Sequence, residues 1–169
     1  MNFEHPSPQQ TQQLLQLWKA VFGEYDGFWE LFLGTAYQPD HCRCITESGQ
    51  VTAGLYWFDC SCGSDKIAYI YAVATAESHR GQGLCHRLMA QAHDHLRSQG
   101  YAGAMLVPGS ASLGDFYAAM GYRYCTHIRE LSAEAAASAI PAQPLSVNEY
   151  AQLRQNMLPE NSVLPGAEA

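Results

Sequence analysis

The chain has 169 residues, of which 47% are hydrophobic, and a formal net charge of −7. This length suits one domain with a hydrophobic core and at most a short appendage. Acidic residues outnumber basic ones and no basic stripe is present, which argues against nucleic acid or an anionic membrane as a partner and favours a cationic molecule such as an amine.

Helices and then strands are expected in the N-terminal part of the chain. Apolar residues recur at helical spacing in two segments, of which the second is aromatic, and three strand-like segments follow, with Ser48-Gly49 as a hairpin turn. The predicted elements are helices over residues 8–22 and about 28–36, and strands over about 43–47, 51–59 and 66–74. In the last strand, the run from Ile67 to Ala74 shows no alternation, so we expect both of its faces to be buried.

A glycine-rich turn connects this strand to a strongly amphipathic helix. It reads Arg80-Gly81-Gln82-Gly83-Leu84-Cys85, and from Leu84 to Leu96 apolar residues recur with a period of about 3.6 residues. The start of a helix presents unpaired N–H groups, and glycines let an anion approach the backbone closely. The turn is neither a nucleoside-triphosphate loop nor Gly-x-Gly-x-x-Gly, because His86 stands where the third glycine would be. The pattern suits a phosphate, although a glycine turn at such a junction also has a purely structural interpretation.

A second strand and helix lie downstream. Gln99-Gly100 is a helix stop, residues 102–107 are expected to form another buried strand, and a loop that contains Ser110 leads into a short helix. This helix carries Tyr117, which stands four residues before Gly121, and an aromatic residue follows that glycine.

In order and spacing, these elements resemble the GNAT family of acetyl-CoA-dependent N-acetyltransferases over roughly residues 10–131. Within the turn, Arg80 and Gly83 agree with the family pattern, whereas Cys85 stands where the family prefers Gly or Ala. The resemblance implies an α/β (α+β) fold, the GNAT fold, in which helices flank a central mixed, mostly antiparallel sheet of about six to seven strands. Splayed parallel strands would form the acetyl-CoA site, and residues 122–131 would supply one or two final strands.

The resemblance also implies which residues bind acetyl-CoA. Backbone N–H groups of the strand would meet the pantetheine amides and the thioester carbonyl, and those of the turn would meet the pyrophosphate, together with the Arg80 side chain. These backbone groups belong to Ala72, Val73 and Ala74 in the strand and to Gly81, Gln82, Gly83, Leu84 and Cys85 in the turn. Ser110 stands where the family often has a cofactor-binding asparagine, and its hydroxyl has a shorter reach.

Tyr117 is the general acid that the resemblance implies, since a phenol can protonate the leaving thiolate of coenzyme A. The alternative is a buried structural tyrosine. No general base is identified, because the strand over residues 67–74 lacks the glutamate that many GNAT enzymes carry there. The candidates by rough proximity, each of which also fits a surface position, are Glu24, Asp26, Asp59, Asp65 and His79. Deprotonation through an ordered water, or an acceptor with a low pKa, is compatible with the missing carboxylate.

Aromatic residues and histidines near the expected site have more than one interpretation. Tyr69 and Tyr71 share one face of their strand, and they either line an acceptor pocket or fill the sheet. The aromatic helix over residues 28–36 lies where the family builds its acceptor wall, and its side chains also suit a core. His86, His93 and His95 are expected mainly on the solvent-exposed side of the motif helix.

The six cysteines include two Cys-x-Cys pairs, Cys42 with Cys44 and Cys60 with Cys62. On a strand, this spacing places both sulfurs on one face about 6–7 Å apart, which suits one tetrahedral ion poorly. Pairing about the hairpin turn places Cys44 near Ala53 and Cys42 near Leu55, not near Cys60. We therefore expect reduced, partly buried thiols and no metal.

The chain is predicted to divide into a GNAT acetyltransferase domain over residues 1–131 and an extension over residues 132–169. The extension would comprise a linker, one helix opened by a capping box from Ser146 to Glu149, and a loose tail. It would pack on the domain or form the contact of a homodimer. No stretch approaches the ~18 apolar residues of a membrane span, and the N-terminus shows no signal pattern, so we expect a cytoplasmic protein.

The predicted function is an N-acetyltransferase that transfers acetyl from acetyl-CoA to an amine of a small molecule or a protein by direct attack. The alternative is a non-catalytic acyl-CoA-binding sensor or regulatory module. The missing strand carboxylate and Ser110 favour the sensor, whereas Tyr117 favours the enzyme. A third hypothesis is a metal-binding scaffold built on the cysteines. The predicted enzyme uses acetyl-CoA as a co-substrate and no metal, and it binds an amine acceptor but neither nucleic acid nor a membrane.

Overall fold

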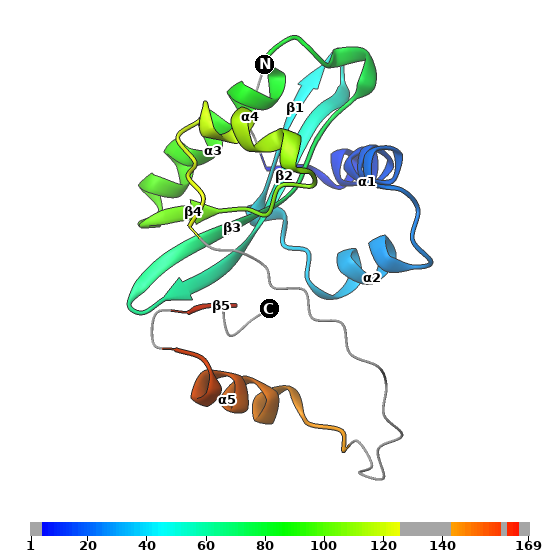
Figure 1. The fold of residues 1–169 in the computed structure, drawn as a ribbon. Coiled ribbons are helices and arrows are strands. Elements are labelled where there is room, and N and C mark those ends of the chain that lie inside the picture. Colours follow the sequence, from blue (N-terminus) through cyan, green and yellow to red (C-terminus); the bar gives the residue numbers. More distant parts are fainter. Residues whose placement is uncertain (1–4, 126–142, 160–161, 166–169) are drawn as a thin grey trace.

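The fold is a mixed β-sheet with helices on both faces, in a computed structural model that describes residues 5–125, 143–159 and 162–165 (Figure 1). In chain order the elements, with η for a short 3₁₀ helix, are α1 (Pro8–Phe22), α2 (Phe28–Thr35), η1 (Pro39–His41), β1 (Cys42–Glu47), β2 (Gln50–Cys62), β3 (Asp65–Thr75), η2 (Glu77–His79), α3 (Leu84–Ser98), β4 (Gly103–Met105), η3 (Ala111–Leu113), α4 (Gly114–Ala118), α5 (Val147–Met157) and β5 (Val163–Pro165). The predicted helices at the N-terminus and after the glycine turn, and the first three strands, are confirmed.

The described strands form one sheet in the order β1-β2-β3-β4, and β5 pairs with β2. The β1–β2, β2–β3 and β2–β5 pairs are antiparallel, and the β3–β4 pair is parallel. The mixed, mostly antiparallel sheet is therefore confirmed. The described part of the chain contributes a 5-stranded sheet instead of the larger one expected, because residues 122–125 are not in a strand. The other residues of the predicted final strands, 126–131, lie outside the described residues.

Each face of the sheet is covered by a hydrophobic core. On one face, α1 begins with a capping box between Ser7 and Gln10 and buries Leu14 and Trp18 together with Phe32 of α2. On the other face, α3 lays an apolar stripe against the sheet. The buried residues of this stripe are Leu84, Leu88, Met89, Ala92 and Leu96. The amphipathic period read from the sequence therefore indicates the packed faces of α1 and α3 correctly.

The β1–β2 hairpin turns at Ser48-Gly49, where both residues have positive φ, as a tight two-residue turn requires. The predicted pairing across this hairpin is wrong by one residue, since Cys44 lies opposite Gly54 rather than Ala53, and Cys42 lies opposite Tyr56. An irregularity in the ladder just before the turn adds one residue to β2 and shifts the register.

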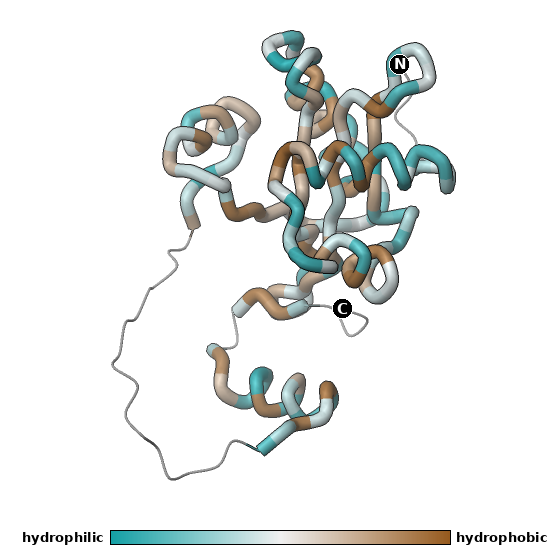
Figure 2. Tube along the Cα trace, turned by 90° about the vertical axis from the view of Figure 1, so that its right-hand side faces the viewer, coloured by the Kyte–Doolittle hydropathy of each residue, from teal (hydrophilic) through white to brown (hydrophobic). Residues whose placement is uncertain are grey.

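The C-terminal helix α5 lies apart from the sheet and its two layers (Figures 1 and 2). Its capping box between Ser146 and Glu149 is formed as predicted, and none of its residues is buried. β5 pairs antiparallel with Cys60–Cys62 at the end of β2, in a stretch where a loose tail was expected. The chain thus returns to the sheet after α5.

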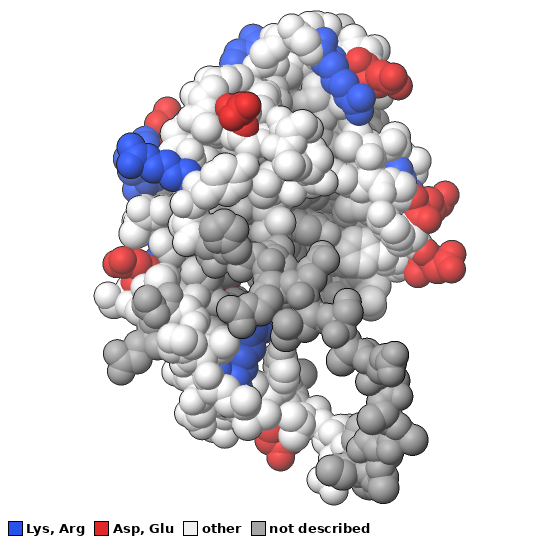
Figure 3. All heavy atoms as spheres, viewed as in Figure 1, with Lys and Arg blue, Asp and Glu red and all other residues white. Residues whose placement is uncertain are grey.

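Charged side chains are scattered over the surface. On the face seen in Figure 3 they lie mostly near the edges, and no basic patch forms there among the described residues. Within the described ranges, no helix combines the length and the apolar character that crossing a membrane requires.

Candidate active site

A β-bulge interrupts β3 at Ala72 and Val73. Gly54 pairs with Ala74 and Tyr56 pairs with Tyr71, so two residues of β3 oppose one residue of β2. The bulge interrupts the usual alternation of side chains along the strand. Tyr71 and Ala72 both border the α1-side core, while Val73 borders the α3-side core. Two of the three strand residues predicted to bind acetyl-CoA therefore form the bulge itself.

The bulge holds Ala72 at a φ of 51°, in the left-handed region that residues with a Cβ rarely adopt. The indole of Trp18, which is completely buried, donates a hydrogen bond from Nε1 to the Ala72 carbonyl at 2.8 Å. The Trp18 side chain of α1 thus stabilises the strained backbone of Ala72. The apolar period of residues 8–22 predicts only that Trp18 packs in a core, because no local pattern reveals a hydrogen bond across 54 residues.

Burial alternates along β3, so the prediction of a strand buried on both faces is wrong. Ala68, Ile70, Ala72 and Ala74 are buried, and the residues between them are half-buried. Tyr69 and Tyr71 therefore form a partly exposed face of the strand.

The parallel strands β3 and β4 separate beside the bulge. Their pairing runs from Ile67 with Gly103 to Tyr69 with Met105 and then stops, although β3 itself continues to Thr75. β4 is accordingly shorter than the strand predicted over residues 102–107. Strands that diverge leave backbone groups without a ladder partner, which a bound ligand can satisfy. The splayed pair that the resemblance implied is thus present where Ala72 to Ala74 lie.

The glycine turn after β3 leaves open space at the start of α3. Gly81 and Gly83 have φ angles of 75° and 72°, and a Cβ at either position would meet no atom within 4 Å. Gly83 is the N-cap of α3, and no side chain caps the helix. The N–H groups of the first turn are therefore available to an anion. Open space, a helix N-terminus and exposed Arg80 together fit a pyrophosphate.

Hydrogen bonds fix the conformation of the glycine turn and of the segment that leads to it. The Ala76 N–H donates to the Thr52 carbonyl at 2.8 Å, which ties the end of β3 to β2. The Gln82 side chain donates to the Ser78 carbonyl at 3.3 Å, and Arg80 Nε donates to the Thr75 carbonyl at 3.4 Å. The Arg80 contact uses one of its five N–H groups. The turn is therefore preformed rather than dependent on a ligand for its shape.

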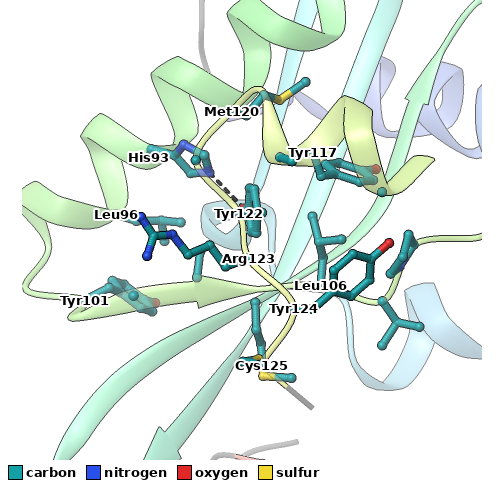
Figure 4. Close-up of a pocket in the computed structure, with 18 of the residues that line it drawn as sticks. His93, Leu96, Tyr101, Leu106, Tyr117, Met120, Tyr122, Arg123, Tyr124 and Cys125 are labelled. Atoms are coloured by element: carbon teal, nitrogen blue, oxygen red, sulfur yellow. Dashed lines mark hydrogen bonds between the residues drawn. The ribbon is translucent and has the colours of Figure 1, made fainter. Parts of the chain in front are cut away.

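Tyr117 lies on α4, on the α3 side of the sheet. Its ring centroid is 5.3 Å from that of Phe116 and 5.8 Å from that of Tyr122, and burial, with a smaller effect of nearby Cys85, raises its pKa. Cys85 is the second residue of α3, so the predicted acid lies close to the start of that helix, where the glycine turn ends. Tyr117 also borders a cavity of about 810 Å³ between α3, α4, the segment after β4 and residues 120–125 (Figure 4).

The other predicted residues lie at different distances from this arrangement. Ser110 is exposed, and its hydroxyl shares a hydrogen bond of 2.8 Å with that of Ser112. His93 and His95 are half-buried rather than solvent-exposed as predicted, because His93 hydrogen-bonds the Tyr122 hydroxyl and His95 lies 2.8 Å from an Arg43 nitrogen. Only His86 of the three is exposed as expected.

Three of the candidate general bases have partners other than the bulge. Asp59, which pairs with Ala68 of β3, accepts a hydrogen bond from the Tyr101 hydroxyl and lies 3.4 Å from Lys66. Glu24 pairs with Lys19 at 2.9 Å. His79 faces Glu47 at 3.7 Å, within the loop that leads to the glycine turn. None of these contacts places a candidate general base beside the bulge.

Cys42 and Cys44 are buried in β1, and burial raises the pKa of Cys42 to about 12. The Cys42 thiol donates to the Leu55 carbonyl at 3.2 Å. Among the described residues, no group of three or more His, Cys, Asp or Glu side chains is arranged to hold a metal ion. None of the described cysteines is joined to another in a disulfide bond.

A glycine turn at a helix N-terminus beside a bulged, splayed parallel strand is the arrangement that the resemblance to the GNAT family implies. The chain matches the family model described as "Acetyltransferase (GNAT) domain" over residues 3–125. The chain therefore belongs to the GNAT family of acetyltransferases.

Solved structures support the fold. The chain is 22% identical to a GCN5-related N-acetyltransferase from Anabaena variabilis, with a TM-score of 0.58 over 66% of this chain and 30% of that one. A GCN5-related N-acetyltransferase from Ralstonia eutropha is 20% identical (TM-score 0.60; 73% of this chain, 93% of that one). The glucosamine-6-phosphate N-acetyltransferase from Arabidopsis thaliana is 17% identical (TM-score 0.61; 79% and 98%). The chain thus spans about 30% of the length of the Anabaena variabilis protein. No curated protein matches the chain.

Proposed function

We propose that the protein is an N-acetyltransferase that transfers acetyl from acetyl-CoA to an amine by direct attack. The observation that carries the proposal is the glycine turn, Gly81 to Gly83, at the uncapped start of α3, which follows the bulged strand β3 after the short helix η2. Acetyl-CoA, when bound, supplies an acetyl group activated as a thioester. The turn with Arg80 would hold the pyrophosphate, and the backbone of Ala72 to Ala74 would hold the pantetheine and the thioester carbonyl.

Tyr117 is the proposed general acid. Burial raises its pKa above the ordinary value of about 10, so the phenol keeps its proton at neutral pH and can donate it to the leaving thiolate. Ser110 is proposed to contact the cofactor through its hydroxyl. Because its hydrogen-bond partner, Ser112, is another exposed serine, that hydroxyl can change partner at little cost.

No side chain is assigned as general base. β3 carries no carboxylate from Ile67 to Thr75, and Asp59 is tied to Tyr101 and Lys66. We propose that the acceptor amine loses its proton to water. The reaction rate should then rise with pH until the amine is fully deprotonated, without a step that belongs to a protein carboxylate.

Calorimetric titration with acetyl-CoA, followed by thiol release against a panel of amines, tests this function. Binding together with turnover on an amine supports the enzyme. Binding without turnover on a broad panel would favour the non-catalytic acyl-CoA sensor, and the absence of binding would refute both.

Trp18→Phe is expected to weaken acetyl-CoA binding about fivefold, because the Ala72 carbonyl loses a hydrogen bond worth about 1 kcal/mol and the bulge relaxes. Trp29→Phe is the matched control. Trp29 is also buried, and its Nε1 donates to the Gly23 carbonyl at 3.0 Å, away from the bulge. Both variants should lower the melting temperature, and only Trp18→Phe should raise the dissociation constant in calorimetry. An equal effect of both variants would mean that Trp18 contributes only to folding.

A further inference from the structure

A group of partly exposed aromatic side chains lies beside the bulge, on the opposite side of the sheet from Tyr117. This tyrosine surface consists of Tyr25, Phe28, Phe58, Tyr69 and Tyr71. The ring centroids of Tyr69 and Tyr71 are 6.2 Å apart, and they lie 6.3 and 5.5 Å from that of Phe58. Tyr25 and Phe28 are 6.5 Å apart, with 61% and 39% of their surfaces exposed.

The two parts of the tyrosine surface meet at α2. Phe32 anchors this helix on the sheet, with its ring 6.2 Å from that of Tyr71 and 6.0 Å from that of Phe58. Burial raises the pKa of Tyr71, and the nearby phenols of Tyr69 and Tyr25 raise it further. Three tyrosines from two separate segments of the chain therefore converge on one place.

The place is next to the proposed reaction centre. Tyr69 is the last residue of β3 that pairs with β4, and Tyr71 directly precedes Ala72 of the bulge. The tyrosine surface thus borders the opening between the two strands from the α2 side, while Tyr117 lies on the α3 side. An acceptor on this surface would approach from the face opposite the proposed acid.

The chemistry of the surface is aromatic and uncharged. Burial raises the pKa of Tyr69 and of Tyr71, so both hydroxyls stay protonated at neutral pH. At its edge, Tyr25 lies between Glu24, which pairs with Lys19, and Asp26, which forms no ion pair with a described residue. Electron-rich rings with a carboxylate nearby attract a cation and stack on a flat ring. No residue of the surface is basic, so it offers no positive charge to a phosphate group.

We infer that the tyrosine surface is the acceptor site, and that the acceptor is a small primary amine attached to an aromatic ring. The inference rests on the proposed acetyltransferase function and adds its substrate class. The ring of the acceptor stacks on Phe58 and the tyrosines, and its amine points toward the bulge at Ala72.

Steady-state kinetics with 2-phenylethylamine test this substrate class, with ethanolamine and glucosamine 6-phosphate as amines without an aromatic ring. The kcat/KM for 2-phenylethylamine should exceed both others about tenfold, and Tyr71→Ala and Tyr25→Ala should each lower it about three- to tenfold. Tyr25 is exposed in a loop, so its variant does not endanger folding. Tyr150→Ala, which removes an exposed tyrosine of α5, is the control and should change nothing. Tyr150→Ala should also leave the kinetics with ethanolamine unchanged.

Calorimetric binding of 2-phenylethylamine without acetyl-CoA separates this inference from the proposed function. Binding that Tyr25→Ala and Tyr71→Ala weaken, with no acetylation of any amine, would refute the acetyltransferase function and support the tyrosine surface as an aromatic amine site. No binding, or binding that neither variant changes, would overturn the tyrosine surface even if the enzyme acetylates other amines. A preference for glucosamine 6-phosphate would overturn the substrate class.

Discussion

Gly83→Val is expected to remove measurable acetyl-CoA binding and to leave the fold in place. A Cβ at Gly83 meets no protein atom, so a side chain there enters the space in which the pyrophosphate would approach the helix. Each charge-assisted hydrogen bond to a phosphate contributes about 1.5–3 kcal/mol, so losing two of them weakens binding at least about 100-fold. Calorimetry with acetyl-CoA measures the loss, and circular dichroism measures the fold.

Gly100→Val is the matched control for this variant. Gly100 follows the other end of α3, has a φ of 80° and also has no atom within 4 Å of a built Cβ. Both substitutions place a branched residue in the left-handed region, at a cost of about 1–2 kcal/mol each. Their melting temperatures should therefore fall together, while only Gly83→Val loses the ligand. Normal affinity in Gly83→Val would show that the turn is not the phosphate site.

Features that depend on local sequence could be predicted well. The helix over Leu84–Ser98 follows from its apolar period, and the α5 capping box follows from Ser146 and Glu149. The glycine turn was predicted from the two glycines, since a positive φ is where glycine has an advantage over other residues. In each case the residues that determine the structure lie within a few positions of one another.

Features that depend on long-range contacts could not be predicted. Nothing in Ala72-Val73-Ala74 indicates a left-handed alanine, because the bulge is stabilised by Trp18 and by the register against β2. His93 was assigned to solvent because helix geometry alone does not show that Tyr122 packs against it. β5 is likewise too short to have a period of its own, and its pairing depends on where the chain returns to β2.

The proposed active site shows the same difference between local and long-range features. The residues that would meet the pyrophosphate lie in one continuous turn, so their sequence pattern was sufficient to place them together. The acceptor side combines Tyr25 from one connection with Tyr69 and Tyr71 from a strand far along the chain. Only the folded sheet brings these residues together, which is why the sequence left their role open between pocket and packing.

Tyr117→Phe is expected to lower kcat about 100-fold at neutral pH and to leave the affinity for acetyl-CoA within about twofold, since general acid catalysis contributes about 10²–10⁴. The variant keeps the ring that packs between Phe116 and Tyr122 and removes only the hydroxyl. Tyr122→Phe is the control from the same cluster, because its hydroxyl bonds His93 Nε2 at 2.8 Å and has no proposed part in the reaction. A similar loss in both variants would indicate a packing effect.

The pH dependence of this defect distinguishes an acid from a packing residue. Because burial raises the pKa of Tyr117, the native enzyme should show no loss of kcat from tyrosine ionisation below about pH 10. The acid contribution of Tyr117 depends on its own proton, so the ratio of native to Tyr117→Phe rates should stay constant from pH 7 to about pH 10 and shrink as the phenol ionises above that range. A ratio that does not shrink even there would mean that Tyr117 positions the site without transferring a proton.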